Sequence, residues 1–323
     1  MGEFLSVPIK DKITEQGEGS IVKYVACGMQ GWRKRMEDAH VASVNIGQTK
    51  STHLFGVFDG HGGKEVSQFV AAHITEELLA NKNFNTNLKT ALSETFIRLD
   101  EMMVEPAGKL ELKKYSKLSK EEDEIINQRE KQNNKGNKNS QFELLNQLMG
   151  KNNEDIDIAL VTGCTSCVCA IDEKNKKIYC ANAGDSRAVI CRKGIAFPLS
   201  VDHKPDLDSE KNRIYKADGW VSEGRVKGNL NLSRSLGDLE YKQNKKLPPA
   251  EQMITAFPEV MVENLTPDVS FMVIACDGIW DCMSNQEICD LISTRLKARI
   301  GLKEIVEEIM DNCLATDIYN GIV

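Results

Sequence analysis

The sequence predicts an α+β domain in which antiparallel strands form sheets that helices cover. Segments with strand-like composition and segments with helical periodicity occur in blocks along the chain, whereas a parallel sheet needs strict alternation of strand and helix. The chain has 323 residues, which is enough to bury a sizeable core. Hydrophobic residues make up 41% of it, as is ordinary for a globular protein. We therefore expect one layered domain over residues 1–323.

The first block of elements is a strand followed by two helices. Residues 51–60, STHLFGVFDG, are mostly apolar and end abruptly in Asp59 and a glycine, which predicts a buried strand. Apolar residues then recur at helical spacing over residues 62–81. A second amphipathic helix is expected from about Asn87, where the same spacing returns.

The composition changes between about residue 106 and residue 157. This segment is rich in Lys, Glu and Asn and has few large apolar residues, so it can bury little surface and should be mobile. Residues 142–149, FELLNQLM, could form a short helix that docks locally. We predict a low-complexity insertion between two elements here, and not a separate domain.

Strand signals dominate the next block. Residues 162–171 and 177–184 flank a polar turn, and residues 187–199 predict a hairpin that turns at Lys193-Gly194. The remaining expected elements are a helix at 205–219, a strand that begins at Val269 and ends in Asp277, and two amphipathic helices at 284–297 and 302–314.

Acidic residues stand out at the ends of two of these strands. Asp59 and Asp277 each end an apolar strand and precede a glycine, and Glu37 and Asp38 lie together in RMEDAH. Carboxylates that emerge close together raise each other's pKa unless a cation lies between them. A cluster of oxygen ligands suits Mg²⁺ or Mn²⁺ and not zinc. Spacing alone leaves two interpretations open, a metal site or ordinary Asp-Gly turns.

Charge and cysteine content exclude several classes of function. The net charge of −7 argues against general nucleic-acid binding. We expect no stable membrane insertion, because no apolar run is long enough to span a bilayer. The ten cysteines are expected to be reduced thiols in the cytoplasm or the nucleus. MGEFLS fits an N-myristoylation pattern at Gly2, which would add weak membrane association, although the charge of Glu3 disfavours it.

Seven motifs follow one another along the chain: MQGWRKRMEDAH, FGVFDGHGG, TGCTS, ANAGDSRAV, DHKP, GNLNLSRSLGD and VIACDGIWDCMSNQE. Their order resembles that of metal-dependent Ser/Thr protein phosphatases of type 2C, the PPM family, over nearly the whole chain except the insertion. The resemblance implies a four-layer α-β-β-α sandwich with two central antiparallel sheets. It also implies a hydrolase, expected to be a monomer, that removes phosphate from phosphoserine and phosphothreonine in protein substrates.

The resemblance assigns metal-binding roles to the acidic residues. Asp59 resembles the carboxylate that bridges two divalent cations, Mg²⁺ or Mn²⁺, and Gly60 would ligate one of them through its carbonyl oxygen. Asp277 would hold the second ion. Glu37 and Asp38 would ligate directly or through water.

The resemblance also implies roles for four further residues. Asp281 matches a ligand of a weaker third metal position. Arg33 resembles an arginine whose planar fork binds two phosphate oxygens. A water of lowered pKa would attack the phosphorus as hydroxide, and His61 would protonate the departing Ser or Thr oxygen. Asp238, in SLGD, is expected to support local structure.

Two departures from the family pattern support an alternative, a catalytically weak or inactive phosphatase-like scaffold that binds partners. Type 2C domains usually finish with a strand that carries an Asp-Asn-Met motif, whose aspartate binds metal. Here the chain reaches CLATDIYNGIV about where that strand should begin. The aspartate that often precedes the TGCTS-like block aligns near Leu160, with Asp157 out of register, so the third-metal position is incomplete. A missing strand would leave a sheet edge exposed.

Cysteine chemistry is a further alternative. Cys27 and Arg33 have the spacing of the loop in cysteine-dependent phosphatases, but the residues that flank that loop differ. Cys164 and Cys167 could suggest zinc or redox chemistry, yet they lie in an apolar strand with no second pair nearby in the sequence. We expect neither chemistry.

Overall fold

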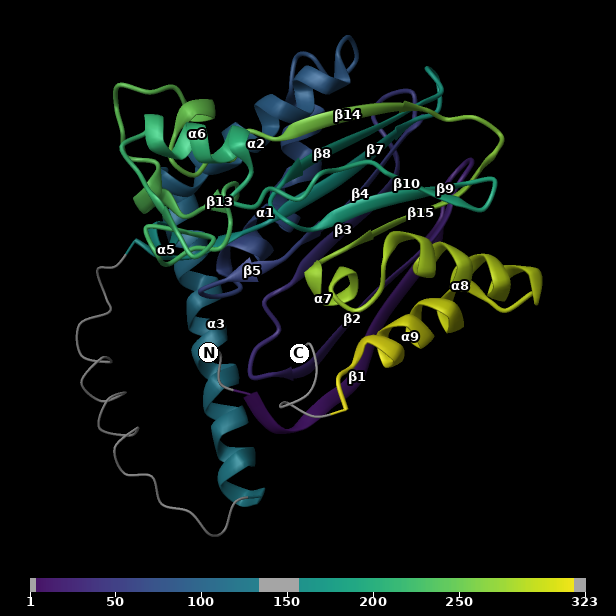
Figure 1. Ribbon diagram of the computed structural model, residues 1–323, viewed down its shortest axis with the longest axis horizontal. Helices are drawn as coiled ribbons and strands as arrows, with labels where there is room; N and C mark the ends of the chain where they lie inside the picture. Colours follow the sequence, from purple (N-terminus) through teal and green to yellow (C-terminus); the bar gives the residue numbers. More distant parts are fainter. Residues whose placement is uncertain (1–3, 134–156, 317–323) are drawn as a thin grey trace.

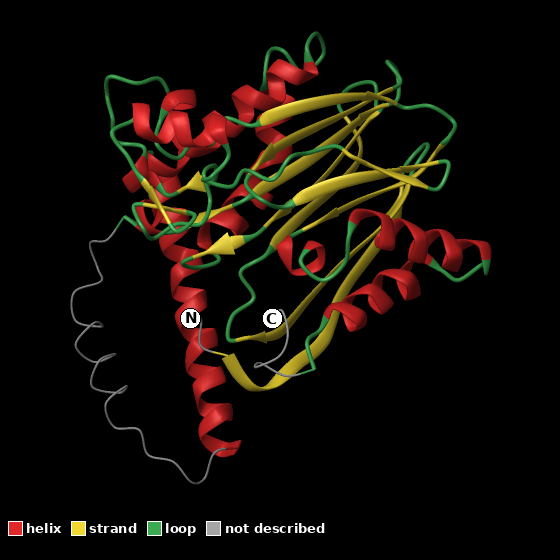
Figure 2. Ribbon diagram, in the orientation of Figure 1, coloured by secondary structure: helices red, strands yellow, loops and turns green. Residues whose placement is uncertain are grey.

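A computed structural model describes residues 4–133 and 157–316 of the chain. Two layers of strands lie between two layers of helices, so the predicted α+β sandwich is confirmed (Figures 1 and 2). No helix among the described residues is both long and apolar enough to cross a membrane.

The first β-layer is an antiparallel sheet of five strands. Its order is β14 (Glu259–Asn264), β8 (Lys177–Ala183), β7 (Ser166–Asp172), β4 (Thr52–Phe58) and β3 (Ala39–Ile46). The central strands read as nearly continuous apolar runs because both of their faces are covered. Leu54 and Phe58 of β4 are fully buried.

Three helices pack on the outer face of this sheet: α1 (Glu65–Ala80), α2 (Leu88–Val104) and α3 (Pro106–Asn133). The predicted second helix begins as expected, because the Asn87 side chain accepts a hydrogen bond from the Thr90 backbone N–H at 3.1 Å. Phe69 of α1 and Phe96 of α2 are buried in the core between helices and sheet.

Residues 106–133 form the helix α3, whereas the sequence predicts a mobile, low-complexity insertion over residues 106–157. Leu112 is fully buried against the core, and Glu111 pairs with His73 of α1 at 2.9 Å. Lys, Glu and Leu are good helix formers, so a composition that indicates disorder also suits a solvated helix with one narrow apolar side. The expected helix at 142–149 lies outside the described residues.

The second β-layer has two parts. Its first part is a three-stranded antiparallel sheet in the order β10 (Ile195–Pro198), β9 (Arg187–Arg192) and β15 (Val269–Ala275). The predicted turn joins β9 to β10, with both Lys193 and Gly194 at positive φ, as a type I′ hairpin requires. Its second part is the long hairpin of β1 (Phe4–Glu18) and β2 (Lys23–Arg33).

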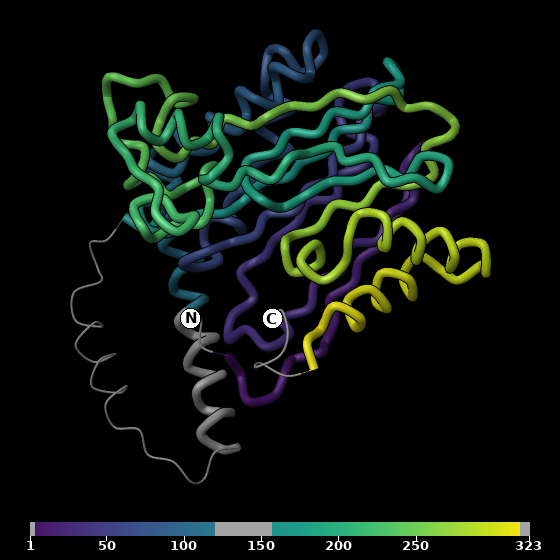
Figure 3. Tube along the Cα trace, viewed as in Figure 1, coloured from purple at the N-terminus to yellow at the C-terminus, as the bar shows by residue number. Residues whose placement is uncertain are grey.

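The outer face of this second layer is covered by α7 (Asp277–Trp280), α8 (Asn285–Lys297) and α9 (Leu302–Cys313). The last helix of the described chain lies beside the first hairpin, which Figure 3 shows as yellow against purple. Lys12 of β1 pairs with Asp311 of α9 at 2.6 Å. Between the two β-layers, Cys167 and Cys180 pack against Ile190 and Met272.

Short elements fill the end of the sandwich where β4 and β15 finish. A small sheet of β13 (Leu236–Gly237), β6 (Gly163–Cys164) and β5 (Gly60–His61) holds His61. The expected helix at 205–219 is α6 (Asp208–Lys216), although no side chain caps it. The other short elements are α5 (Ile158–Val161), β11 (Val221–Ser222), β12 (Arg225–Val226) and two 3₁₀ turns at Leu239–Tyr241 and Pro249–Glu251.

Candidate active site

Asp59 is held at the end of β4 by its own backbone. Its N–H donates to the hydroxyl oxygen of Thr165 at 3.1 Å, and its carbonyl accepts from the Thr165 N–H at 2.9 Å. Thr165 is 1% exposed and also bonds to Ser186 at 2.7 Å. This fixed strand end aims the Asp59 carboxylate out of the first sheet toward the second.

Three aspartates from separated segments meet at this point. Ligand atoms of Asp38, Asp59 and Cys276 all lie within 4.8 Å of one another. Side-chain hydrogen bonds join Asp59 to Asp38 and to Asp277. A hydrogen bond between two carboxyl groups needs a proton on one of them, because ionised carboxylates only accept. Without a metal ion, a shared proton therefore keeps these carboxyl groups together. The structure thus brings Asp59 and Asp277 together, as the sequence predicts.

The electrostatics of the cluster fit a hard divalent cation. Burial raises the pKa of Asp59 well above its usual value, and the charges of Asp38, Asp277 and Asp185 raise it further. Burial is also the main cause of the raised pKa of Asp38 and of Asp277. Burial, followed by the neighbouring carboxylates, raises the pKa of the Cys276 thiol well above its usual value, so that sulfur stays protonated. The available donors are therefore oxygens, as Mg²⁺ and Mn²⁺ prefer.

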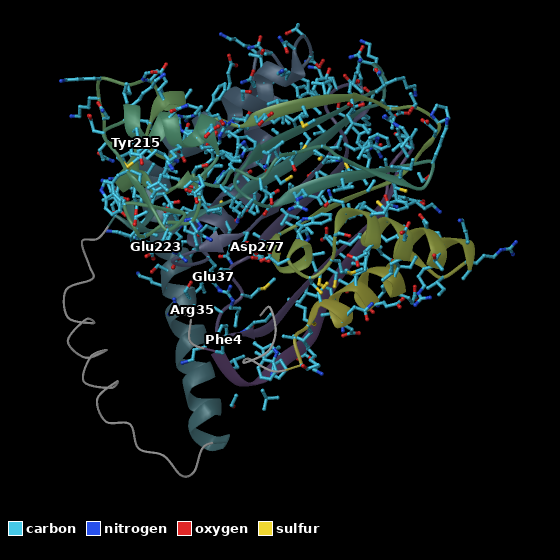
Figure 4. All side chains as sticks on the ribbon, in the orientation of Figure 1. Phe4, Arg35, Glu37, Tyr215, Glu223 and Asp277 are labelled. Carbon is cyan, nitrogen blue, oxygen red and sulfur yellow. The ribbon has the colours of Figure 1, made fainter. Side chains whose placement is uncertain are left out.

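Glu37 and Gly60 lie beside this cluster and contact each other. A Cβ atom at Gly60 would collide with the carbonyl oxygen of Glu37, so only glycine lets the two backbones approach this closely. Ser67 donates a hydrogen bond to the same Glu37 carbonyl. Burial raises the pKa of Glu37, while Arg35 and Arg33 oppose that shift. Figure 4 shows Glu37 and Asp277 in the central region of the molecule, and both line one cavity.

Asp281 lies one helical turn after Asp277 and is exposed. Its N–H donates to the Asp277 carbonyl at 2.8 Å, and its charge contributes to the raised pKa of Asp277. Asp157, the acidic residue next to the incomplete third-metal position, pairs with Lys109 at 2.6 Å. Of the residues that the resemblance assigns to a third ion, Asp281 would therefore be the side chain available to bind it.

The structure adds an ion pair that the sequence did not single out. Asp185, buried at the end of β8, pairs with Lys204 from the DHKP motif. This contact outweighs burial and raises the pKa of Lys204. A signal was present in the sequence, because Asp185 follows an apolar strand and a glycine in ANAGD, much as Asp59 follows its strand.

His61 is paired with Asp238, which sequence reasoning had given only a local structural role. The His61 Nε2 donates to Asp238 Oδ2 at 2.7 Å, and the Ser235 hydroxyl donates to the same oxygen. Burial of His61 lowers its pKa, but Asp238 and then Glu37 and Asp185 more than reverse this, so the pKa of His61 is raised. The imidazole is 27% exposed, so it can reach a substrate.

The pair depends on local backbone features. A Cβ atom at Gly163 would overlap both Asp238 Oδ2 and His61 Nε2, so only glycine leaves room for the contact. Asp238 itself has a φ of 49°, a left-handed conformation that is uncommon outside glycine. Backbone strain of this kind is found where a side chain must be placed for function.

Arg33 ends β2 and is exposed at the rim of the same cavity. This cavity measures about 930 Å³, and its lining includes Arg33, Asp59, His61 and Asp277. The positive charge of Arg33 lowers the pKa of both Glu37 and Asp38. A guanidinium beside an acidic cluster and an imidazole could bind the oxygens of a phosphate group.

The cysteine-dependent alternative does not fit the geometry. Cys27 and Arg33 both belong to the extended strand β2, so their side chains cannot form one phosphate-binding loop. Burial raises the pKa of the Cys27 thiol, whereas a nucleophilic cysteine needs a lowered one. Cys164 and Cys167 are fully buried.

Comparisons with known proteins agree with this geometry. The family model described as protein phosphatase 2C matches residues 22–116 and 103–320. The chain is 42% identical over 322 residues to probable protein phosphatase 2C 21 of Arabidopsis thaliana, covering 99% of this chain and 89% of that protein. It is 43% identical over 326 residues to probable protein phosphatase 2C 3 of Paramecium tetraurelia, covering 99% and 95%.

Solved structures share the fold at lower identity. A crystal structure of a phosphatase from Toxoplasma gondii matches with a TM-score of 0.61 at 21% identity, covering 96% of this chain and 90% of that one. A sex-determining protein of C. elegans matches with a TM-score of 0.61 at 22% identity, covering 95% and 62%. With relatives above 40% identity along its whole length, this chain belongs to the protein phosphatase 2C family.

Proposed function

We propose that the cavity at the ends of β4 and β15 is where this protein phosphatase hydrolyses phosphoserine and phosphothreonine. The family consists of metal-dependent protein serine/threonine phosphatases, which fixes the reaction class. The observation that carries the assignment to this cavity is the meeting of Asp38, Asp59 and Asp277, which lie far apart in the sequence, in one buried acidic cluster.

Asp59 and Asp277 would hold two Mg²⁺ or Mn²⁺ ions together with the Gly60 carbonyl, and Glu37 and Asp38 would ligate directly or through water. Asp281 would serve a weaker third position. When bound, such ions supply Lewis-acid charge and lower the pKa of water enough to make a nucleophile at neutral pH. The oxygen-rich donor set and the raised carboxyl pKa values support this proposal.

The remaining chemistry belongs to Arg33 and His61. Arg33 would bind two phosphate oxygens with its planar fork and so orient the substrate at the rim of the cavity. His61, whose pKa is raised by Asp238, would donate a proton to the departing Ser or Thr oxygen, whose alkoxide leaves poorly at neutral pH. Asp238 also fixes the imidazole orientation through its contact with Nε2.

The partners of the enzyme follow from the family and the charge. Its substrates would be phosphorylated proteins, and the net charge of −7 gives no support for nucleic acid as a partner. We propose that the enzyme acts in the cytoplasm or the nucleus, because the cysteines of the described residues are free thiols. We propose that it acts as a monomer. Acylation of Gly2 would add only weak membrane association.

Hydrolysis of a phosphothreonine peptide during titration with Mn²⁺ tests the proposed site. Asp59→Asn should lose about a hundredfold or more in kcat/KM, because it removes a carboxylate that would hold the cations, and the cations would stabilise the charge of the transition state. Asp311→Asn, at an exposed carboxylate paired with Lys12, should match the unchanged protein. Equal background rates for the unchanged protein and Asp59→Asn at millimolar Mn²⁺ would overturn the proposal and favour the scaffold alternative.

A further inference from the structure

A carboxylate on the outer helix α2 anchors the segment of residues 235–242. The Oδ1 atom of Asp100 accepts a hydrogen bond from the Gly237 N–H at 2.9 Å. Its Oδ2 atom pairs with Lys242. The Nζ atom of Lys242 also donates to the Ser235 carbonyl at 2.8 Å. One side chain of α2 is therefore tied to this segment directly at one point and through Lys242 at another.

These anchors hold an uncommon backbone conformation. Gly237 has a φ of 74° and Asp238 a φ of 49°, so two successive residues are left-handed. This conformation is unfavourable for a residue with a Cβ atom. The Gly237 N–H is bonded to Asp100, and the Asp238 N–H donates to the Thr162 carbonyl at 2.9 Å. These two hydrogen bonds thus keep Asp238 in a conformation that its own backbone preference opposes.

The anchored segment supplies the groups that contact the imidazole of His61. Asp238 Oδ2 accepts from His61 Nε2 at 2.7 Å, and the Ser235 hydroxyl donates to the same oxygen. The backbone carbonyl of Ser235 is the group that Lys242 binds. The pair of Asp100 and Lys242 therefore fixes the segment on both sides of Asp238.

Burial and charge make this pair sensitive to substitution. The side chains of Lys242 and Asp100 are only 8% and 14% exposed, so water screens their charges little. Burial raises the pKa of Asp100, and the charge of Lys242 opposes that shift. Burial alone would raise the pKa of Asp238, but His61, Ser235 and Lys242 together lower it. Removal of Lys242 would leave two carboxylates close together at a buried place.

We propose that Asp100 and Lys242 are positioning residues of the phosphatase reaction. They hold Asp238, and through it the imidazole of His61, in the orientation that delivers a proton to the leaving group. This inference rests on the proposed role of His61. The described lining of the cavity includes neither Asp100 nor Lys242, so the pair acts through Asp238 and not on the substrate. Loss of the pair should impair proton delivery and leave substrate binding in place.

Steady-state kinetics on two substrates at saturating Mg²⁺ test the proposal. Asp100→Asn keeps an oxygen that can accept from the Gly237 N–H but loses the ion pair with Lys242. On a phosphothreonine peptide we expect kcat to fall about fivefold or more and KM to stay within about twofold. On p-nitrophenyl phosphate, whose leaving group needs no protonation, kcat should also stay within about twofold. A purely structural role would lower both rates by the same factor.

Substitutions of Lys242 test the pair from its other side. Lys242→Gln should show the same difference between the two substrates, and Lys242→Arg, which keeps the charge, should restore the behaviour of the unchanged protein. The two sides are independent, so a variant that fails to fold leaves the other to decide. Leu112→Ala, at a buried position of α3, is the control for lost stability and should leave the ratio of the two rates unchanged.

A second measurement does not depend on catalysis. In metal-free protein, the NMR signals of the His61 imidazole, assigned by comparison with His61→Gln, should move in Asp100→Asn and in Lys242→Gln. They should stay in place in Leu112→Ala, because α3 makes no contact with the segment 235–242 through that side chain. Unchanged imidazole signals in both variants of the pair would overturn the inference.

His61→Gln separates this inference from the proposed function. If His61→Gln loses activity on the phosphothreonine peptide alone, while Asp100→Asn and Lys242→Gln lose equally on both substrates, the inference is wrong and the proposed proton donor stands. If His61→Gln itself loses equally on both substrates, the proposed proton donor is wrong and the inference falls with it. The expected result is one shared selectivity for the peptide in all three variants.

Discussion

At the scale of single residues, the contact between His61 and Asp238 would determine how the proposed site supplies a proton to the leaving group. The two residues are separated by 177 positions in the sequence, and the pair forms only because Gly163 leaves space for it. The buried carboxylate favours the charged imidazolium, so His61 can hold a proton at a pH where an isolated histidine would lose it. If His61 is the proton donor, as we propose, Asp238 is its positioning residue.

Asp238→Asn should lower activity selectively on substrates with poor leaving groups. Without the carboxylate the pKa of His61 falls, so the limb on which activity declines with rising pH moves to lower pH. On a phosphothreonine peptide we expect kcat to fall about tenfold or more. On p-nitrophenyl phosphate, whose leaving group needs no protonation, the loss should be small. The measurement is kcat against pH for both substrates.

Asp208→Asn, in the first turn of α6, is the control for that experiment and should leave both pH profiles unchanged. Equal losses of Asp238→Asn on the two substrates, with an unshifted pH limb, would mean that Asp238 has only a structural role.

Some residues of the candidate site carry a signal in the sequence around them, and others do not. Asp59 and Asp277 each interrupt an apolar run, and this local signal is visible without any knowledge of the fold. Two pairs depend on how distant segments of the chain pack together, which no local sequence pattern encodes: Asp238 with His61, and Lys204 with Asp185. The local pattern left a metal site and ordinary turns both open, and the resemblance to the phosphatase family singled out Asp59 and Asp277, whereas neither of them indicated the pairing of Lys204 with Asp185.

At the scale of elements, α3 shows how a polar composition can be misread. Its Lys- and Glu-rich sequence gave no sustained apolar face, and the helix docks through few side chains. Mean composition cannot separate a disordered segment from a helix that is mostly solvated, because the difference lies in a few spaced apolar residues.

Leu112→Ala should therefore destabilise the protein, by about 2–4 kcal/mol, because it leaves a cavity at a fully buried position. Leu110→Ala, on the same helix but 60% exposed, should change the free energy of unfolding by less than about 0.5 kcal/mol. Denaturant unfolding of both variants measures the difference. Similar values for the two would contradict the docking of α3.

His203, which lies near Gly184, Glu259 and Glu210, makes the stability of the protein depend on pH. The backbone N–H of His203 donates to the Gly184 carbonyl at 2.9 Å, and the Nε2 atom of its imidazole lies 3.5 Å from the Glu259 carboxylate. Burial, together with the charge of Arg234, lowers the pKa of His203 from 6.5 to about 4. Glu210 nearby, although buried, is held ionised by Arg234 and Arg213, which lower its pKa to about 2.

Acidification from pH 7 to pH 5 should destabilise the fold through His203. In this window the unfolded chain binds a proton on the imidazole and the native state does not, so stability falls by about 2 kcal/mol by pH 5. His203→Gln should remove this part of the pH slope, whatever its effect on absolute stability. Chemical unfolding at several pH values measures it. Glu210 contributes only below its ordinary pKa of 4.5, outside the window.

At the scale of the whole molecule, the sandwich brings like charges together at one end. The layer architecture was predictable, because blocks of strands and helices have few ways to cover one another. The division of the second layer into a sheet and a hairpin was not, because it depends on which edges pair. The result is a fold whose strand ends concentrate Asp38, Asp59, Asp185 and Asp277 in one region. Without a cation, this arrangement costs the native state free energy.

Asp59→Asn should consequently have opposite effects on stability with and without metal. A carboxyl pKa that is raised on folding destabilises the native state at neutral pH, where the unfolded chain is ionised, so the neutral amide should raise the melting temperature in EDTA. With Mg²⁺ or Mn²⁺ at a hundred times its dissociation constant, the unchanged protein should gain about 2.7 kcal/mol and the variant much less. Thermal unfolding of both proteins in both buffers measures this reversal. Asp311→Asn should melt like the unchanged protein throughout. If Asp59→Asn were less stable in EDTA and gained as much from metal, the acidic cluster would not be the cation site.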